Sequence, residues 1–155
     1  MEKKTIIISP YSQKLRNGKN NPKNYPYWDE LVLELKKKDF YIIQIGVSGE
    51  KSITGVDEVK FNQSLKEIED LLRNCYVFIS VDNFLPHLAN CIGVRGIVLW
   101  GQSDPDIFGY KENINILKDR KYLRRNQFDV WESCEYNKDS FVLVSNIINS
   151  IDIIK

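Results

Sequence analysis

The sequence has few of the residues that mark specialised protein classes. Its 155 residues include one histidine, one methionine and three cysteines. An odd number of cysteines without metal-ligand spacing argues against a disulfide framework or a zinc site, and apolar surroundings favour reduced core thiols. Low-complexity tracts and internal repeats are also missing. We therefore expect one globular core and predict no metal or cofactor.

Long hydrophobic runs and an excess of one charge are missing too. The first apolar stretch covers only residues 5–8, whereas a signal-peptide core needs roughly 7 to 15 residues and a membrane helix roughly 18. The net charge of +1 provides no global field for nucleic acid or an acidic membrane surface. These absences predict a cytoplasmic protein with no membrane span and no nucleic-acid partner. The basic residues at 118–125 are interpreted as a solvated face.

Short β-branched and apolar runs alternate with helical patterns along the chain. The runs at 5–9, 40–47, 76–81 and 96–100 are apolar on both faces, which is typical of buried parallel strands. The intervening segments predict helices that cover both faces of the sheet. This order predicts one α/β, Rossmann-like domain over residues 1–155, with a parallel sheet flanked by helices.

Local signals predict where the helices begin and end. Pro26 suits the first turn of a helix that ends near residue 38, and Ser64 with Glu67 forms a capping box for the next helix. Pro86 is expected to start a third helix through residue 92, with Gly93 ending it. The last helix is expected over about 140–154, with Asp139 as a possible cap. The polar loop at 10–25 is long enough to predict function or mobility.

Ligands of an open parallel sheet bind beyond the carboxyl ends of its strands, where four loops are expected here. Lys23, together with backbone amides at 86–88, is suited to a pyrophosphate. Glu50 is suited to ribose hydroxyls, and Asp82 to sugar hydroxyls. Each of these roles has an alternative: Asp82 caps a helix, Glu50 makes no contact with ligand, and Lys23 is a solvated loop lysine. A structural hydrogen bond is the alternative for His87, and Trp28 and Trp100 are expected in the core.

Two motifs in residues 80–110 resemble the donor-binding segment of the ADP-heptose:lipopolysaccharide heptosyltransferases and their GT-B relatives. In that family a strand ends in Asp-Thr-Gly-x-x-His, and a later strand is followed by Gly-x-Thr-Asp-Pro. Asp82 and His87 match the first motif, and Gly101, Ser103, Asp104 and Pro105 match the second. The segment from Lys23 to Trp28 is similar to the family's Lys-x-Trp-Pro, whose lysine approaches the donor phosphates. Glu50 is similar to an acid near the nucleotide ribose.

The resemblance implies one half of a GT-B fold and a nucleotide-diphosphate sugar as ligand, ADP-linked if this chain follows the family. It assigns no catalytic residue. The residues implied in donor binding are Lys23, Glu50, Asp82, Asn83, His87, Ser103 and Asp104.

Two departures from the family pattern keep several functions open. Asn83-Phe84 replaces Thr-Gly, which puts side chains where backbone normally approaches phosphate. The acceptor half is also expected to be absent, because Met1 leads almost directly into the first strand. The chain is then a glycosyltransferase component completed by an acceptor-binding subunit or by self-association. The alternatives are a non-catalytic nucleotide sensor or sequestering module, and a decayed fragment.

Overall fold

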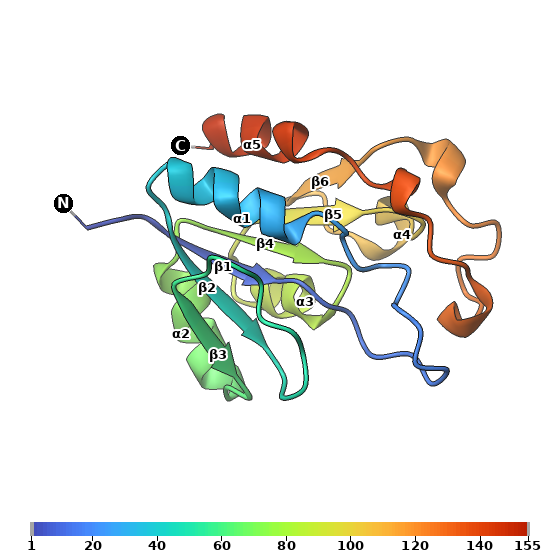
Figure 1. Cartoon of the computed structure of the whole chain (residues 1–155), viewed down its shortest axis with the longest axis horizontal. Coiled ribbons are helices and arrows are strands. Elements are labelled where there is room, and N and C mark those ends of the chain that lie inside the picture. Colours follow the sequence, from blue (N-terminus) through green and yellow to red (C-terminus); the bar gives the residue numbers. More distant parts are fainter. Residues whose placement is uncertain (1, 155) are drawn as a thin grey trace.

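Six short runs of the chain pair side by side as parallel strands in a computed structural model that describes residues 2–154 (Figure 1). The strand order is β3-β2-β1-β4-β5-β6, which is the doubly wound Rossmann arrangement. The predicted α/β fold is therefore confirmed, and the four predicted strands are neighbours. The strands are β1 (Thr5–Ser9), β2 (Tyr41–Gly46), β3 (Glu58–Phe61), β4 (Val77–Val81), β5 (Ile97–Trp100) and β6 (Ile114–Leu117).

Helices cover both faces of the sheet. On one face lie α1 (Trp28–Lys37) and α5 (Val144–Asp152), and on the other lie α2 (Leu65–Asn74) and α3 (Phe84–Cys91) (Figure 1). Successive strand residues point to opposite faces, so Ile6 and Ile8 pack under α1 and α5 while Ile7 packs under α2 and α3. This explains why the strands are apolar at nearly every position.

Two helix starts differ from their predicted positions. The first helix begins at Trp28, and Pro26 lies in a bend before it, because the buried Tyr25 ring packs edge-on against Trp28. α3 begins at Phe84, two residues before Pro86, because the Asn83 side chain caps it by accepting from Leu85 N. The capping box of Ser64 and Glu67 is confirmed, with both reciprocal hydrogen bonds present.

The sequence interpretation also missed two strands and misplaced a third helix start. β3 and β6 are the edge strands, each has four residues, and neither has a fully buried position, so their apolar patterns are weak. α5 begins at Val144 rather than near residue 140, and Asp139 does not cap it. Asp139 instead lies in a short 3-10 turn at 138–140 that precedes the buried residues Phe141 and Val142.

The cysteines are free, as predicted, but they are not core residues. Cys91 is exposed at the end of α3, and Cys75 and Cys134 are half-buried. The prediction of core thiols was wrong because each cysteine lies at the end of a helix or 3-10 turn, where the chain returns to the surface.

Candidate functional site

The strand order reverses between β1 and β4, and we refer to the carboxyl ends of these two strands as the crevice, the position at which doubly wound sheets bind ligands. These neighbouring strands are followed by loops that lead to helices on opposite faces of the sheet, so the loops diverge. The loop after β1 carries Lys23, and Asp82 follows β4 directly. Side chains from the two loops meet there.

Asp82 is the centre of this meeting point. Its Oδ2 accepts a hydrogen bond from Ser103 Oγ at 2.8 Å and pairs with Lys23 Nζ at 3.1 Å. Asp82 as a whole is 8% exposed, so a carboxylate here needs such partners. The structure therefore brings three predicted site residues together, from the loops after β1, β4 and β5. The alternative that Asp82 caps α3 is wrong, since Asn83 does so.

Asn83 links the ends of β1 and β4. Its Oδ1 caps α3, and its Nδ2 donates to Ser9 Oγ at 2.9 Å and to Tyr11 O at 3.1 Å. The amide therefore fixes the floor of the crevice through bonds within the protein. The next residue, Phe84, is 46% exposed.

The amino end of α3 offers fewer free amides than the sequence suggested. Because the helix begins at Phe84, the backbone N–H groups of His87 and Leu88 lie beyond its first turn, and Pro86 has none. Leu85 N already donates to Asn83. The amides at 86–88 therefore do not form the free amino end of this helix, and Lys23 brings a positive charge to the crevice from the loop after β1.

Asp104 adjoins Ser103 but is directed away from Lys23. Its carboxylate receives both terminal nitrogens of Arg120, at 3.1 and 2.9 Å, and caps the four-residue helix α4 (Pro105–Phe108). The hydrogen bond from Arg120 lowers the pKa of Asp104. Arg120 was predicted on a solvated basic face; its side chain is 56% exposed, and it also holds the loop after β5 through the buried Asp104 carboxylate.

Glu50 lies in the loop after β2 and makes no contact with Lys23 or Asp82 among the described hydrogen bonds and ion pairs. Its carboxylate folds back and accepts from Val47 N at 2.9 Å, and burial raises its pKa. Gly46 makes this possible, since a Cβ there would lie 2.1 Å from the Glu50 carboxylate. Tyr11 connects the two loops by donating its hydroxyl to Lys51 O at 2.8 Å.

His87 stands apart from the Asp82 cluster. It is exposed on α3, where its Nδ1 lies 2.8 Å from the Tyr110 hydroxyl and the two rings meet edge to face. The alternative of a structural hydrogen bond therefore describes the contact that this side chain makes.

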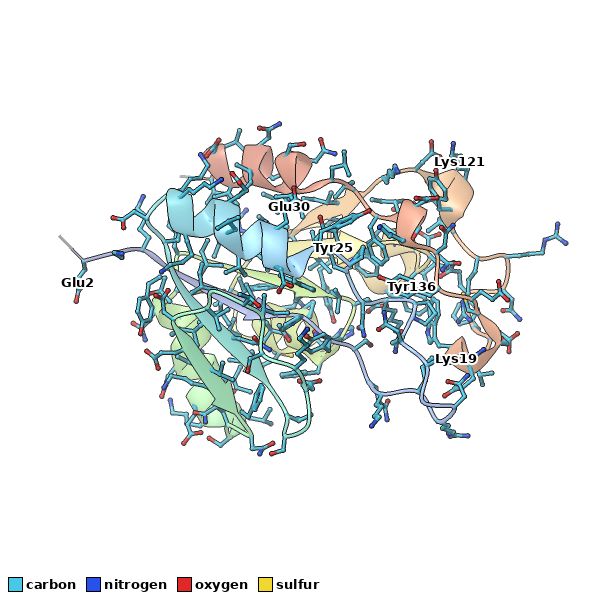
Figure 2. The ribbon with its side chains drawn as sticks, viewed as in Figure 1. Glu2, Lys19, Tyr25, Glu30, Lys121 and Tyr136 are labelled. Atoms are coloured by element: carbon cyan, nitrogen blue, oxygen red, sulfur yellow. The ribbon has the colours of Figure 1, made fainter. Side chains whose placement is uncertain are left out.

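The segment after β6 contributes residues that the sequence interpretation did not include. The Trp131 ring lies 3.5 Å from the guanidinium of Arg124 and 5.1 Å from Lys23 Nζ. Glu132 accepts from Arg16 N at 2.9 Å, and Tyr136 donates to Asn24 O at 2.6 Å, so this segment lies beside the loop after β1 (Figures 1 and 2). Interleaved cations and aromatics at 118–131 were the available signal, but a sequence does not show which loop they face.

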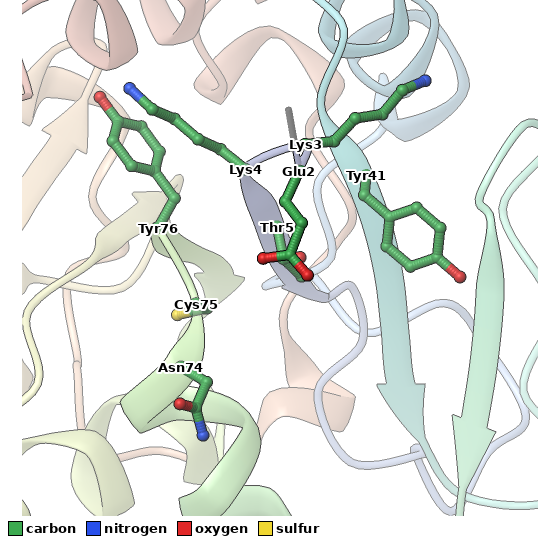
Figure 3. A pocket seen from close by; sticks show the side chains of 8 residues that line it. All are labelled: Glu2, Lys3, Lys4, Thr5, Tyr41, Asn74, Cys75 and Tyr76. Atoms are coloured by element: carbon green, nitrogen blue, oxygen red, sulfur yellow. The ribbon is translucent and has the colours of Figure 1, made fainter.

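A hollow of the molecule lies away from these residues. About 510 Å³ of open space is found at the amino edge of the sheet, and none of the predicted site residues lines it (Figure 3). Its walls are Glu2, Lys3, Lys4, Thr5, Tyr41, Asn74, Cys75 and Tyr76. Within residues 2–154 no three metal-ligating side chains gather, and none of the helices described there has the length and apolarity to cross a membrane.

Comparison with known proteins agrees with this arrangement. The model of glycosyltransferase family 9 (heptosyltransferase) matches residues 1–133. Among solved structures, the E. coli heptosyltransferase WaaC with ADP is 18% identical with a TM-score of 0.66, over 97% of this chain and 44% of that chain. The glycosyltransferase family 9 protein of Veillonella parvula is 14% identical with a TM-score of 0.73, over 97% of this chain and 46% of that chain.

A third structure is the dodecameric, iron-containing heptosyltransferase TibC of enterotoxigenic E. coli in complex with ADP-D-beta-D-heptose. It is 17% identical with a TM-score of 0.69, over 98% of this chain and 46% of that chain. The chain thus spans less than half the length of these structures, and the likeness to them shows the fold. No curated protein sequence matches the chain.

Proposed function

Since the chain belongs to glycosyltransferase family 9, we propose that it binds a nucleotide-diphosphate sugar at the carboxyl edge of its sheet. The observation that carries the proposal is the meeting of Lys23 and Asp82 at the crevice between β1 and β4. A cation for the diphosphate and a carboxylate for sugar hydroxyls stand side by side there. The complexes of WaaC with ADP and of TibC with ADP-heptose support an ADP-linked donor.

The surrounding side chains have distinct parts in this proposal. Ser103 orients the Asp82 carboxylate through its 2.8 Å hydrogen bond, which leaves Oδ1 to accept from a sugar hydroxyl. Glu50 binds the ribose through Oε2, while its Oε1 accepts from Val47 N. Asn83 and Asp104 hold the loops that carry the site, and His87, paired with Tyr110, lies at its margin.

Transfer of the sugar requires groups beyond these. Donor binding stabilises the ground state, whereas rate enhancement requires a base at the acceptor hydroxyl and a surface that orients the acceptor. Lys23, Asp82 and Ser103 are bonded to one another, and His87 pairs with Tyr110. We therefore propose that acceptor-binding and catalytic groups come from residues outside these 155, on a longer chain, a separate subunit or a second copy.

One observation favours a second function, a nucleotide-binding module without transferase activity that senses or sequesters its ligand. Phe84 is 46% exposed beside the crevice, at the position where the family motif has glycine. A side chain there narrows the approach of a diphosphate to the backbone. In a decayed fragment neither donor nor nucleotide would bind.

A thermal-shift screen with nucleotides and nucleotide sugars tests donor binding. A ligand at 100 times its dissociation constant adds about 2.7 kcal/mol to the free energy of unfolding. The variant Lys23→Ala is expected to weaken binding by about 1 to 3 kcal/mol, because a charged hydrogen bond to phosphate is lost. Absence of any shift across adenine, uracil and guanine nucleotides would refute the donor-binding proposal.

Lys4→Ala is the matched control for this variant. Lys4 also lies over an aromatic ring, with its Nζ 4.5 Å from the Tyr76 centroid, but at the amino edge of the sheet. Its removal should leave nucleotide affinity unchanged. Sugar transfer to an added acceptor by the 155-residue chain as a monomer, near the enzyme median of about 10 per second, would contradict the need for further residues.

A further inference from the structure

The Lys23–Asp82 ion pair is the most buried one among the described residues. The two side chains are 20% and 11% exposed, whereas every other pair has a side chain that is at least 28% exposed. Trp131 lies on the Lys23 ammonium at 5.1 Å, and Ser103 occupies the same carboxylate oxygen as Lys23 does. Water has little access to either charge.

Breaking such a pair is costly when one charge stays behind without a partner. Removal of one member of a buried pair leaves the other desolvated and uncompensated, which costs more than the pair itself contributes. If a diphosphate draws Lys23 away, Asp82 remains buried with Ser103 as its only side-chain partner. A ligand must therefore replace the lysine at Asp82 or bear that cost.

We propose that Asp82, which loses Lys23 when a diphosphate binds, makes this site select nucleotide sugars over free nucleoside diphosphates. This inference rests on the proposed function. A nucleotide sugar brings phosphate oxygens to Lys23 and hydroxyl donors to Asp82, so both charges keep partners when the pair separates. A nucleoside diphosphate satisfies Lys23 alone. Asp82 then disfavours retention of the diphosphate once the sugar is gone.

The variant Asp82→Asn tests the inference because it removes the competing charge with little change of shape. Its affinities for ADP and for inorganic pyrophosphate, a probe that does not depend on the base, should rise roughly tenfold, or about 1.4 kcal/mol. Its affinity for ADP-heptose should not rise, because the sugar loses a charged acceptor. Isothermal titration of the three ligands would thus show the preference for the nucleotide sugar reduced by roughly tenfold or more.

Two further variants separate this role from a general effect of charge. Lys23→Ala should weaken ADP and ADP-heptose alike and leave their ratio as in the wild type, because Asp82 still discriminates between them. Asp57→Asn is the matched control: Asp57 pairs with Lys36 at 2.6 Å and accepts from Ile42 N, at the amino edge of the sheet. It should change none of the three affinities.

The outcomes distinguish this inference from the proposed function. An unchanged or weakened affinity of Asp82→Asn for ADP, or an equal gain for ADP and ADP-heptose, would overturn the selection role while nucleotide binding stands. Failure of the wild type to bind pyrophosphate, nucleotide or nucleotide sugar would overturn both. If thermal melting shows that Asp82→Asn does not fold, Asp82→Ser is the second variant, with the same expected direction.

Discussion

The amino and carboxyl edges of the sheet differ in how their charged side chains are buried and held. The amino edge has a hollow of about 510 Å³, and the ion pair of Lys3 with Asp39 beside it has side chains 47% and 77% exposed. At the carboxyl edge the carboxylates of Asp82 and Asp104 are buried, and each is held by a side chain from another loop. In Figure 3 the side chains of the amino edge spread around the hollow and come from the start of β1, the start of β2 and the segment at the end of α2.

This difference separates the cross-linked charges of the carboxyl edge, where predicted site residues meet, from an opening that none of the predicted site residues lines. Burying Asp82 and Asp104 is unfavourable unless hydrogen bonds compensate it, so each is matched by partners from a different part of the chain. The pair of Lys3 and Asp39 bears no comparable desolvation cost, and an exposed pair contributes little to stability. The fixed arrangement of the loops at the carboxyl edge therefore depends on the same contacts that compensate the buried charges.

The largest expected effect comes from the two glycines that flank β5. A Cβ on Gly96, at the amino edge, would lie 2.4 Å from the Phe78 ring, and one on Gly101, at the carboxyl edge, 2.7 Å from Ser140 Oγ and the Phe141 ring. Overpacking of this kind costs roughly 1 to 3 kcal/mol, so both Gly96→Ala and Gly101→Ala should lower the free energy of unfolding, measured in urea, by about 2 to 3 kcal/mol.

Nucleotide affinity separates these two variants. Gly101 precedes Ser103 and Asp104, so the folded Gly101→Ala protein should also bind nucleotide more weakly, while the folded Gly96→Ala protein should bind as the wild type does. Gly49→Ala is a control for backbone strain without overpacking, because φ is +94° there and nothing lies within 4 Å of a Cβ. Equal loss of affinity in both flanking variants would remove the distinction between the edges.

A smaller effect is expected from acid. The pKa of Asp104 in the folded protein is lowered below its ordinary value of 3.8 by Arg120, so the unfolded chain binds the proton more readily. The stability that Asp104 contributes is therefore fully present above about pH 4 and is lost as the pH falls through the lowered pKa. Asp104→Asn should flatten the fall in stability between pH 5 and 2, measured by urea unfolding at each pH.

Asp57 provides the comparison at the amino edge. Burial raises its pKa, but hydrogen bonds from Lys36 and Ile42 N with nearby positive charge outweigh this, and its pKa is also lowered. Asp57→Asn should flatten the acid profile in the same way. Only Asp104→Asn should also weaken nucleotide binding at neutral pH, since it frees the loop after β5. A profile as steep in Asp104→Asn as in the wild type would contradict the assigned role of Arg120.

The sequence predicted the layers of this fold more fully than its contacts. A short run with apolar residues on both faces identifies a central strand, so the sequence predicted β1, β2, β4 and β5. The half-exposed edge strands β3 and β6 were not predicted. The grouping of Lys23, Asp82 and Ser103 followed from the rule that parallel strands share one carboxyl edge. Whether those residues bind a donor stays a prediction.

What the sequence could not provide is the orientation of side chains between loops. Asp104 and Ser103 are adjacent in the sequence, yet the Asp104 carboxylate accepts from Arg120 and the Ser103 hydroxyl donates to Asp82. Asp104 also caps α4, which begins at the next residue. Glu50 folds back on Val47 N, a contact set by the turn at Gly46. Such choices depend on burial and on long-range partners, which local patterns do not encode.

The smallest expected effect concerns Trp131, which the sequence interpretation left unassigned. Its ring lies 5.1 Å from the Lys23 ammonium, a distance at which a cation and an aromatic ring attract by about 0.5 to 1 kcal/mol at partly exposed sites. Trp131→Leu should therefore weaken nucleotide binding about two- to fivefold, and Trp131→Phe, which keeps a ring, by less. Isothermal titration measures both affinities.

In a double-mutant cycle the loss of affinity caused by Trp131→Leu should vanish in the Lys23→Ala background, because the ring then has no ammonium to position. Tyr76→Leu removes the ring under Lys4 at the amino edge and should leave affinity unchanged. Equal weakening by Trp131→Leu with and without Lys23 would instead assign Trp131 to packing against Arg124.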